Sequence, residues 1–172
     1  MKNQRMNKIR QYYDGISKGY DELYGEEQLK KVKFIVEEFK EVFEQKKKIL
    51  DAGAGTGILN KFLKNKDLIS LDISPKMLEK NKNDKKIIGS ITKMPFKNKE
   101  FDLVFCITVL QDLNENEIEK AIKEIKRTSK NAIISFLKKS SKKETIIKFL
   151  KKFAKIEKIV ELEKDIVLFA TL

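Results

Sequence analysis

The sequence predicts an α/β fold with an open, doubly wound and mostly parallel sheet of seven strands. From residue 47 onward, short apolar runs alternate with amphipathic helical segments, and strands separated by helices pair in parallel through right-handed crossovers. Segment 101–107 is almost continuously apolar, as expected of a strand covered on both faces. Segment 155–172 has two apolar runs without a helix between them, which predicts a C-terminal antiparallel hairpin.

The individual elements follow from apolar periodicity and from turn residues. Apolar residues at helical spacing across 25–44 predict a long amphipathic helix ahead of the sheet. Pro75 suits the first turn of a helix, where its missing N–H costs nothing. Before the hairpin, strands are expected at 47–51, 68–72, 86–89, 101–107 and 132–137. Helices are expected from the glycine turn to about residue 66, from residue 75, over 114–127 and over 142–153.

The length of 172 residues suits one domain with a single core. Within this domain, 1–172, we expect residues 1–45 to form an N-terminal helical cap and residues 46–172 to form the α/β core. No apolar run approaches the roughly 18 residues of a membrane helix, and residues 1–10 lack the apolar stretch of a secretory signal. The sequence therefore predicts a soluble, cytoplasmic protein that binds no membrane, and it leaves the oligomeric state open.

The residue types that are missing exclude several kinds of chemistry. The only cysteine is Cys106, so no internal disulfide can form, and the chain contains no histidine. Neither a Cys/His zinc site nor a histidine general base can be assembled, and we expect no metal. Catalysis must then rely on positioning, on carboxylates and tyrosines, or on a cofactor that carries its own reactivity.

The formal net charge of +12 admits two interpretations. Dense charged surfaces rich in lysine and glutamate are common in proteins of hot environments. A basic chain can also bind an anionic partner, of which nucleic acid is the obvious candidate. Composition alone does not decide between them.

A glycine turn follows the first predicted strand, in the run ILDAGAGTG. Gly53 and Gly55 allow the main chain to turn sharply and allow a ligand to approach it without meeting a Cβ. Asp72 stands nineteen residues after Gly53, at the end of the second strand, where a carboxylate can accept hydrogen bonds from both ribose hydroxyls. These features predict an adenosine-containing ligand across the carboxyl ends of the two strands.

The details of the turn favour a cationic ligand. In the dinucleotide fingerprint GxGxxG the third glycine comes three places after the second, but Ile58 stands at that position here. Asp51 directly precedes the turn, and its charge would repel a pyrophosphate but attract an ammonium group. A nicotinamide-dependent oxidoreductase remains an alternative on the same fold.

Several motifs in order resemble those of class I S-adenosylmethionine-dependent methyltransferases, in particular the "type 11" group. They are ILDAGAGTG, LISLDIS with the following PKMLEK, GSITKMPFKNKEFDLVF and TVLQDL, preceded by YYDGISKGYDELYG. The resemblance covers roughly residues 12–113 and implies a Rossmann-like fold with S-adenosylmethionine as cofactor. It does not specify the methyl acceptor.

The resemblance implies roles for individual residues around the turn. Gly53 and Gly55, with Ala54 between them, would lie against the methionyl part of the cofactor. Asp51 would lie near the methionyl amine, and Asp72 would bind the ribose.

The resemblance also implies an adenine site, with Ile73 and Met77 on the two faces of the ring. The family usually has an aspartate after the third strand that receives the adenine amino group, and this chain has Ser90 there. Ser90 can still accept a hydrogen bond, and Ile91 would offer its backbone N–H. The loss of the charge favours one alternative function, a non-catalytic partner subunit that retains the fold.

The reacting end of the cofactor would be bordered by Cys106 and Ile107, at the end of the fourth strand. Tyr13 or Tyr20 would close over the methionyl end, although the N-terminal tyrosines could instead only fasten this segment to the core. Cys106 has no basic neighbour in sequence to activate its thiol, so we expect a buried lining residue and not a nucleophile.

The resemblance leaves the catalytic residues undetermined. The family often carries a histidine pair after the fourth strand, and this chain has Gln111 and Asp112 there. If the acceptor must lose a proton, Asp112, Tyr13 and Tyr20 are the candidates. Gln111 and Asp112 could also only cap the helix that follows.

The acceptor is inferred from the segment after the fifth strand, which has no lid insertion. A small molecule would be poorly enclosed there, whereas phosphate groups could bind the lysines at this rim. The sequence therefore favours RNA, with tRNA as the plausible kind, over a small molecule and over a protein acceptor. An activating protein partner is also possible. The rim lysines are Lys138, Lys139, Lys142 and Lys143.

Overall fold

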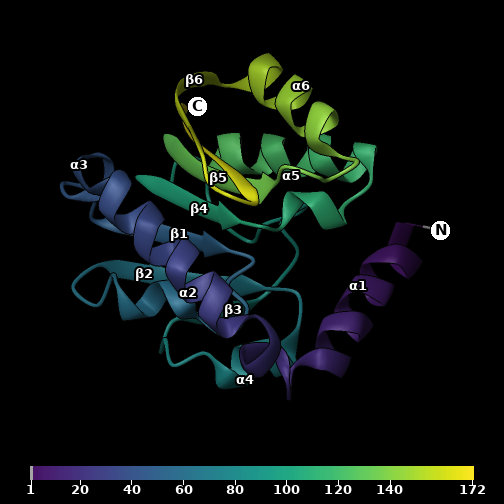
Figure 1. Cartoon of the computed structure of the whole chain (residues 1–172). Helices are drawn as coiled ribbons and strands as arrows, with labels where there is room; N and C mark the ends of the chain where they lie inside the picture. Colours follow the sequence, from purple (N-terminus) through teal and green to yellow (C-terminus); the bar gives the residue numbers. More distant parts are fainter. Residues whose placement is uncertain (1) are drawn as a thin grey trace.

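The computed structural model describes residues 2–172, with side chains from residue 4 onward. Its centre is one seven-stranded sheet with the strand order β3-β2-β1-β4-β5-β7-β6 (Figure 1). The first five strands run parallel, and β7 lies antiparallel between β5 and β6. The predicted Rossmann-like sheet with a C-terminal antiparallel hairpin is therefore confirmed. The strands are β1 (Lys48–Ala52), β2 (Asp67–Asp72), β3 (Lys86–Ile88), β4 (Leu103–Ile107), β5 (Asn131–Leu137), β6 (Lys155–Glu161) and β7 (Asp165–Thr171).

The helices pack on both faces of this sheet and beyond one of its ends. None of the helices within residues 2–172 is both long and apolar enough to cross a membrane. The α-helices are α1 (Lys2–Ile16), α2 (Tyr20–Glu38), α3 (Lys40–Phe43), α4 (Pro75–Lys80), α5 (Glu115–Thr128) and α6 (Lys143–Phe153). Two short 3₁₀ helices are η1 (Ile58–Lys61) and η2 (Leu110–Asp112).

Two apolar clusters, one on each face of the sheet, form the core. The alternation of side chains along each strand separates them, since neighbours such as Ile49 and Leu50 point to opposite faces. On one face, α2, α3 and η1 cover β1, β2 and β4, with Ile35 and Phe39 fully buried. On the other face, α5 and α6 cover the sheet with residues such as Ile118. The N-terminal helix α2 is therefore part of the core.

Helix α1 lies beyond the carboxyl ends of the strands (Figure 1). It contacts the core through the apolar side chains of Met6 and Ile9 and through polar contacts. The hydroxyl of Ser74, the N-cap of α4, donates to Asp14 Oδ1 at 2.6 Å. Arg5 pairs with Glu117 at 3.2 Å. Together with the apolar contacts, these two polar contacts hold α1 across the end of the sheet.

The predicted helix after the glycine turn is wrong, because only the short η1 forms between the turn and β2. Gly57, with a left-handed φ of +83°, is the N-cap of η1, and the helix ends after one turn, at Lys61. Leu59 and Leu63 are nonetheless buried in the core next to α2. The helix signal came from these apolar residues four positions apart, which successive turns place on the same face.

The long helix predicted over 25–44 is two helices, because the helical conformation is interrupted at Phe39, between α2 and α3. The break lets both Phe39 and Phe43 enter the core. Helix α2 also begins earlier than predicted, at Tyr20. The other predicted strands and helices are present with boundaries within two residues, and Pro75 opens α4 as expected.

Replacing Ile35 with Ala should lower the free energy of unfolding by about 2–5 kcal/mol, since it removes fully buried methyl groups between α2 and the sheet. The matched control is Ile88→Ala on β3, where the side chain is 60% exposed and the loss should stay below about 1 kcal/mol. Urea unfolding of both variants measures the difference. Equal losses would show that α2 is not packed into the core.

Candidate functional site

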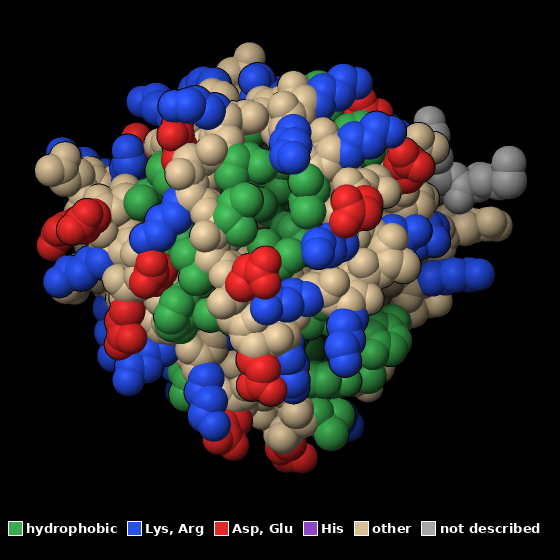
Figure 2. Space-filling view, turned by 45° about the horizontal axis from the view of Figure 1, so that its top comes forward, with side chains coloured by type: hydrophobic (Ala, Val, Ile, Leu, Met, Phe, Trp, Pro, Cys, Tyr) green, Lys and Arg blue, Asp and Glu red, His purple; other side chains and the backbone are tan. Residues whose placement is uncertain are grey.

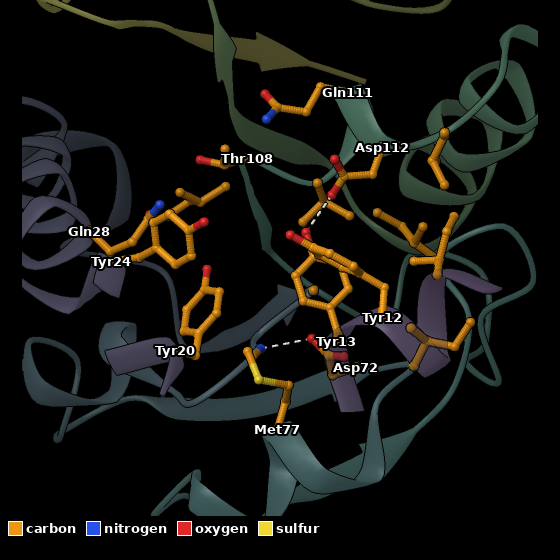
Figure 3. Close-up of a pocket in the computed structure, with 18 of the residues that line it drawn as sticks. Tyr12, Tyr13, Tyr20, Tyr24, Gln28, Asp72, Met77, Thr108, Gln111 and Asp112 are labelled. Atoms are coloured by element: carbon orange, nitrogen blue, oxygen red, sulfur yellow. Dashed lines mark hydrogen bonds between the residues drawn. The ribbon is translucent and has the colours of Figure 1, made fainter. Parts of the chain in front are cut away.

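A cavity of about 280 Å³ lies at the carboxyl ends of the parallel strands, beneath α1 and the first turns of α2 (Figure 3). Its floor comes from the tips of β1, β2 and β4, and its cover comes from the N-terminal helices. The predicted site residues in its wall are Tyr13, Tyr20, Gly53, Gly55, Asp72, Ile73, Met77, Ile91, Ile107, Gln111 and Asp112.

Asp72 connects the glycine turn to the end of β2. Its Oδ2 accepts the N–H of Gly55 at 2.8 Å, and its Oδ1 accepts the N–H of Ser74 at 2.8 Å. Burial raises the pKa of Asp72, while these backbone donors act to lower it. Each carboxylate oxygen has a second lone pair, so Asp72 can accept further hydrogen bonds from a ligand in the cavity.

The glycine turn exposes its main chain to the cavity. Gly53 has φ +86°, and a Cβ there would meet the side chain of Val109. Gly55 has φ +52°, and a Cβ there would reach Met77 Cε at 3.3 Å. The turn therefore requires residues without a side chain at both positions, and a ligand can contact the backbone directly.

Asp51 is a buried carboxylate directly behind this turn, 4% exposed. Its side chain accepts no hydrogen bond within the described part of the chain. Burial, and secondarily the charge of Asp72, raise the pKa of Asp51 to about 7. An unpaired buried carboxylate is costly, and a cation placed nearby would offset that cost. This carboxylate and the exposed main chain fit a cofactor with a cationic end.

Four tyrosines from α1 and α2 line the cavity. The ring centroids of Tyr12 and Tyr13 are 5.2 Å apart, those of Tyr13 and Tyr20 6.4 Å, and those of Tyr20 and Tyr24 5.3 Å. Figure 3 shows their rings around the hollow above Asp72. Burial and the nearby carboxylates raise the pKa of Tyr20 to about 12, so its hydroxyl stays protonated at neutral pH.

Tyr13 also fastens α1 to the segment after β4. Its hydroxyl donates to Asp112 Oδ2 at 2.6 Å (Figure 3). Burial raises the pKa of both groups, and the hydrogen bond opposes the rise at Asp112. The hydrogen bond between Tyr13 and Asp112 thus joins a helix of the cover to the wall of the cavity.

The far end of the cavity lies at the tips of β4 and β5. Thr108 has a left-handed φ of +61°, a strained conformation for a β-branched residue. Its Oγ1 accepts a hydrogen bond from Lys31 Nζ at 3.0 Å, and the same ammonium lies 2.9 Å from Asp165 Oδ1. Gln111 Oε1 accepts the N–H of Leu137 at 2.8 Å. This end of the cavity is therefore polar and tightly fixed.

Four residues predicted to bind the cofactor lie outside the wall of the cavity. Asp51 is behind the turn, and Ala54 uses its N–H to bond Leu71 O at 3.0 Å. Cys106 was expected to border the cavity, but it is fully buried in the core and does not line it. Ser90 accepts the N–H of Thr92 at 3.2 Å in a local turn and does not line the cavity.

Sequence reasoning missed several lining residues on α2, above all Lys31. Tyr20, Tyr24, Glu27 and Lys31 follow one another at intervals of four, three and four residues, which places them on one stripe of a helix. Extending the helical periodicity back to Tyr20 would have identified this stripe. The remaining missed members of the wall are Met6, Ile9, Tyr12, Ile16, Gln28, Leu71, Gly89, Thr108, Val109, Leu113 and Leu137.

The four rim lysines do not line the cavity. Lys138 is paired with Glu161 at 3.0 Å, and Lys139 is exposed. Lys142 and Lys143 are half-buried at the start of α6. On the face shown in Figure 2, basic side chains are interspersed with acidic and hydrophobic ones and form no continuous basic patch.

Comparison with known proteins yields both a family and relatives. The model of the family described as "Methyltransferase domain" matches residues 50–134. The uncharacterized protein MJ1252 of Methanocaldococcus jannaschii is 35% identical over 130 residues, which cover 72% of this chain and 48% of that protein. The chain thus spans about half the length of this curated relative.

Solved structures share the fold at low sequence identity. Magnesium protoporphyrin IX methyltransferase from Synechocystis PCC 6803, with bound S-adenosylmethionine, is similar with a TM-score of 0.80, 18% identity and coverage of 97% of this chain and 96% of that chain. A SAM-dependent methyltransferase from Aquifex aeolicus has a TM-score of 0.63, 17% identity and coverage of 78% and 87%.

Residues 50–134 belong to the methyltransferase-domain family, and the strand order and the neighbouring folds are those of the class I S-adenosylmethionine-dependent methyltransferases, as the motifs indicated. S-adenosylmethionine is the cofactor of this superfamily, and the buried Asp51 beside an open glycine turn fits its cationic methionyl end. The described residues contain no group of three or more acidic or cysteine side chains arranged to hold a metal ion.

Replacing Asp51 with Asn should stabilise the ligand-free protein by an amount that depends on pH. The pKa of Asp51 is about 7 in the folded state and about 3.9 in an unfolded chain, so the folded state binds more protons between these values. Wild-type stability should therefore fall relative to the variant from about pH 4 to pH 7 and then level off. The full difference is about 4 kcal/mol at most.

Urea unfolding of both proteins from pH 4 to pH 9 measures this difference. A stability gain that stays constant with pH would mean that Asp51 ionises normally. The same substitution should weaken the binding of S-adenosylmethionine at pH 8, where Asp51 carries a charge.

Proposed function

We propose that this protein transfers the methyl group of S-adenosylmethionine to a small molecule that enters the cavity. The supporting observation is the cover formed by α1 and α2 over the carboxyl ends of the strands. The sequence favoured RNA because no lid follows β5, but the cover here comes from the N-terminal helices.

In this proposal the residues at the tips of β1 and β2 hold the cofactor. The main chain of Gly53 and Gly55 approaches it, Asp72 accepts hydrogen bonds from its ribose, and Asp51 balances its positive end. When bound, S-adenosylmethionine supplies an electrophilic methyl group. No histidine is required, since the protein's main tasks are alignment and the exclusion of water.

In this proposal the cover, formed by α1 and the first turns of α2, excludes water from the cavity. The hydrogen bond from Tyr13 to Asp112 at 2.6 Å joins α1 to the segment after β4, and Asp14 joins it to the start of α4. Tyr20 begins α2 next to this bond. Closing the site in this way strengthens every electrostatic interaction inside it.

The neighbouring folds also support a small-molecule acceptor. The Synechocystis enzyme, which aligns over nearly the whole of both chains, is named for a small molecule, magnesium protoporphyrin IX. The lysines that favoured RNA stand outside the cavity, and Lys138 is already neutralised by Glu161. RNA remains an outcome of the test below.

The test is a transfer assay with S-adenosylmethionine labelled at the methyl group. Purified protein is incubated with bulk tRNA, rRNA, protein and small-molecule extracts, and label should enter only the small-molecule fraction. Label in tRNA or rRNA would overturn the choice of acceptor. Cofactor binding without any transfer would instead indicate a non-catalytic partner subunit, and calorimetric binding of NAD in place of S-adenosylmethionine would indicate an oxidoreductase.

A lysine variant serves as the matched control for this assay. Replacing the four rim lysines, Lys138, Lys139, Lys142 and Lys143, with Gln should leave both cofactor affinity and transfer to small molecules unchanged. The physical reason is that these side chains lie outside the cavity. A loss of transfer with retained cofactor affinity would place the acceptor on this rim and argue for a phosphate-bearing acceptor.

A further inference from the structure

The acidic side chains near the far end of the cavity fall into two groups. Glu27 lies 2.6 Å from Lys164, and Asp165 lies 2.9 Å from Lys31, so these two negative charges are neutralised by lysines. Asp112 is different, because its carboxylate accepts only the hydroxyl of Tyr13 within the described chain.

The nearest arginine does not neutralise Asp112. Arg5 Nη2 donates to the backbone carbonyl of Asp112 at 3.2 Å, and Arg5 Nε pairs with Glu117. Asp112 therefore brings an unbalanced negative charge into the wall of the cavity. Burying such a charge is costly unless a cation meets it.

A row of aromatic rings begins at this carboxylate. Tyr13 bonds it directly, and the rings of Tyr12, Tyr20 and Tyr24 continue the row at centroid spacings of 5.2–6.4 Å (Figure 3). Tyr12 and Tyr24 are 57% and 42% exposed, so their rings border the mouth of the cavity. The face of an aromatic ring attracts a cation within about 6 Å of its centroid.

Resting on the proposed function, we propose that the methyl acceptor carries a basic amine, which the cavity binds as an ammonium group between Asp112 and the tyrosine rings. A carboxylate supplies the opposite charge, and the rings supply an apolar wall that also attracts cations. A carboxylate-bearing acceptor fits less well, because Lys31, the only lysine in the wall among the side chains from residue 4 onward, already faces Asp165.

The bound ammonium must lose one proton before its nitrogen can accept a methyl group. Asp112 is placed to take that proton: the N–H bond breaks, its electron pair stays on nitrogen, and an O–H bond forms at the carboxylate oxygen that Tyr13 does not occupy. Burial raises the pKa of Asp112, which favours this transfer.

A competing explanation assigns the rings to the sulfonium of the cofactor itself. The two explanations differ in one measurable ratio. S-adenosylmethionine carries a positive sulfur and S-adenosylhomocysteine does not. If the outer rings bind the cofactor, removing one ring should weaken the binding of S-adenosylmethionine more than the binding of S-adenosylhomocysteine. If they serve the acceptor, the ratio of the two affinities should stay the same.

The test uses three compact probes of similar shape, tetramethylammonium, tert-butanol and pivalate, titrated by NMR into the protein with and without saturating S-adenosylhomocysteine. Tetramethylammonium should bind at least about tenfold more tightly than tert-butanol, with pivalate weakest. Asp112→Asn and Tyr24→Leu should each weaken the binding of tetramethylammonium by about threefold or more. Tyr24→Phe retains the ring and should bind normally.

Glu27→Gln is the matched control, since Lys164 already neutralises that carboxylate and tetramethylammonium affinity should change by less than about twofold. Equal binding of tert-butanol, preferential binding of pivalate, or a lowered ratio of S-adenosylmethionine to S-adenosylhomocysteine affinity in Tyr24→Leu would overturn the inference. Failure of S-adenosylhomocysteine to bind would contradict the proposed function instead. The probe titrations without it would still test the amine site.

Discussion

The carboxylate of Asp72 is the constraint on which the site depends. It accepts the N–H of Gly55 from the turn after β1 and the N–H of Ser74 from the cap of α4. The backbone of Gly53 is fixed from the same side, because its N–H donates to Leu71 O at 2.8 Å. Two neighbouring strand tips are thereby joined, and their main chain and carboxylate face one cavity. Without these groups at the strand tips, the cavity under α1 and α2 would lack the main chain and the carboxylate that bind the ligand.

The fold could be predicted because its signals are local. The buried strand β4, the alternation of strands and helices, and Pro75 at the start of α4 each follow from residues close in sequence. The spacing of Gly53 and Asp72 likewise predicted that the turn and the carboxylate meet, and a hydrogen bond between Gly55 and Asp72 joins them. The helix predicted after the turn was wrong because only the four residues of η1 are helical there, and apolar periodicity does not reveal how far a helix continues.

The cover of the site was expected only through the resemblance, which implied that Tyr13 or Tyr20 closes over the methionyl end. Residue patterns alone could not predict it, because it depends on contacts between residues far apart in the chain. Tyr13 and Asp112 are separated by 99 positions, and Lys31 and Thr108 by 77. No local pattern indicates that α1 crosses the strand ends. The same limitation affected the acceptor: a lid was sought after β5, next to Lys138, and the enclosing helices come from the other end of the chain. Charge composition suggested a partner, whereas the pairing of individual charges determines what the cavity can bind.

The most direct test of the central claim is the affinity of S-adenosylhomocysteine for Asp72→Ala, measured by calorimetry. Loss of this carboxylate should weaken binding by about 1–3 kcal/mol, or about 5- to 150-fold, since it leaves the ribose without its charged acceptor and frees the glycine turn. Asp67→Ala, at the opposite end of β2, is the control and should bind normally. Unchanged affinity in Asp72→Ala would mean that the nucleoside is held elsewhere, and the proposed site would be wrong.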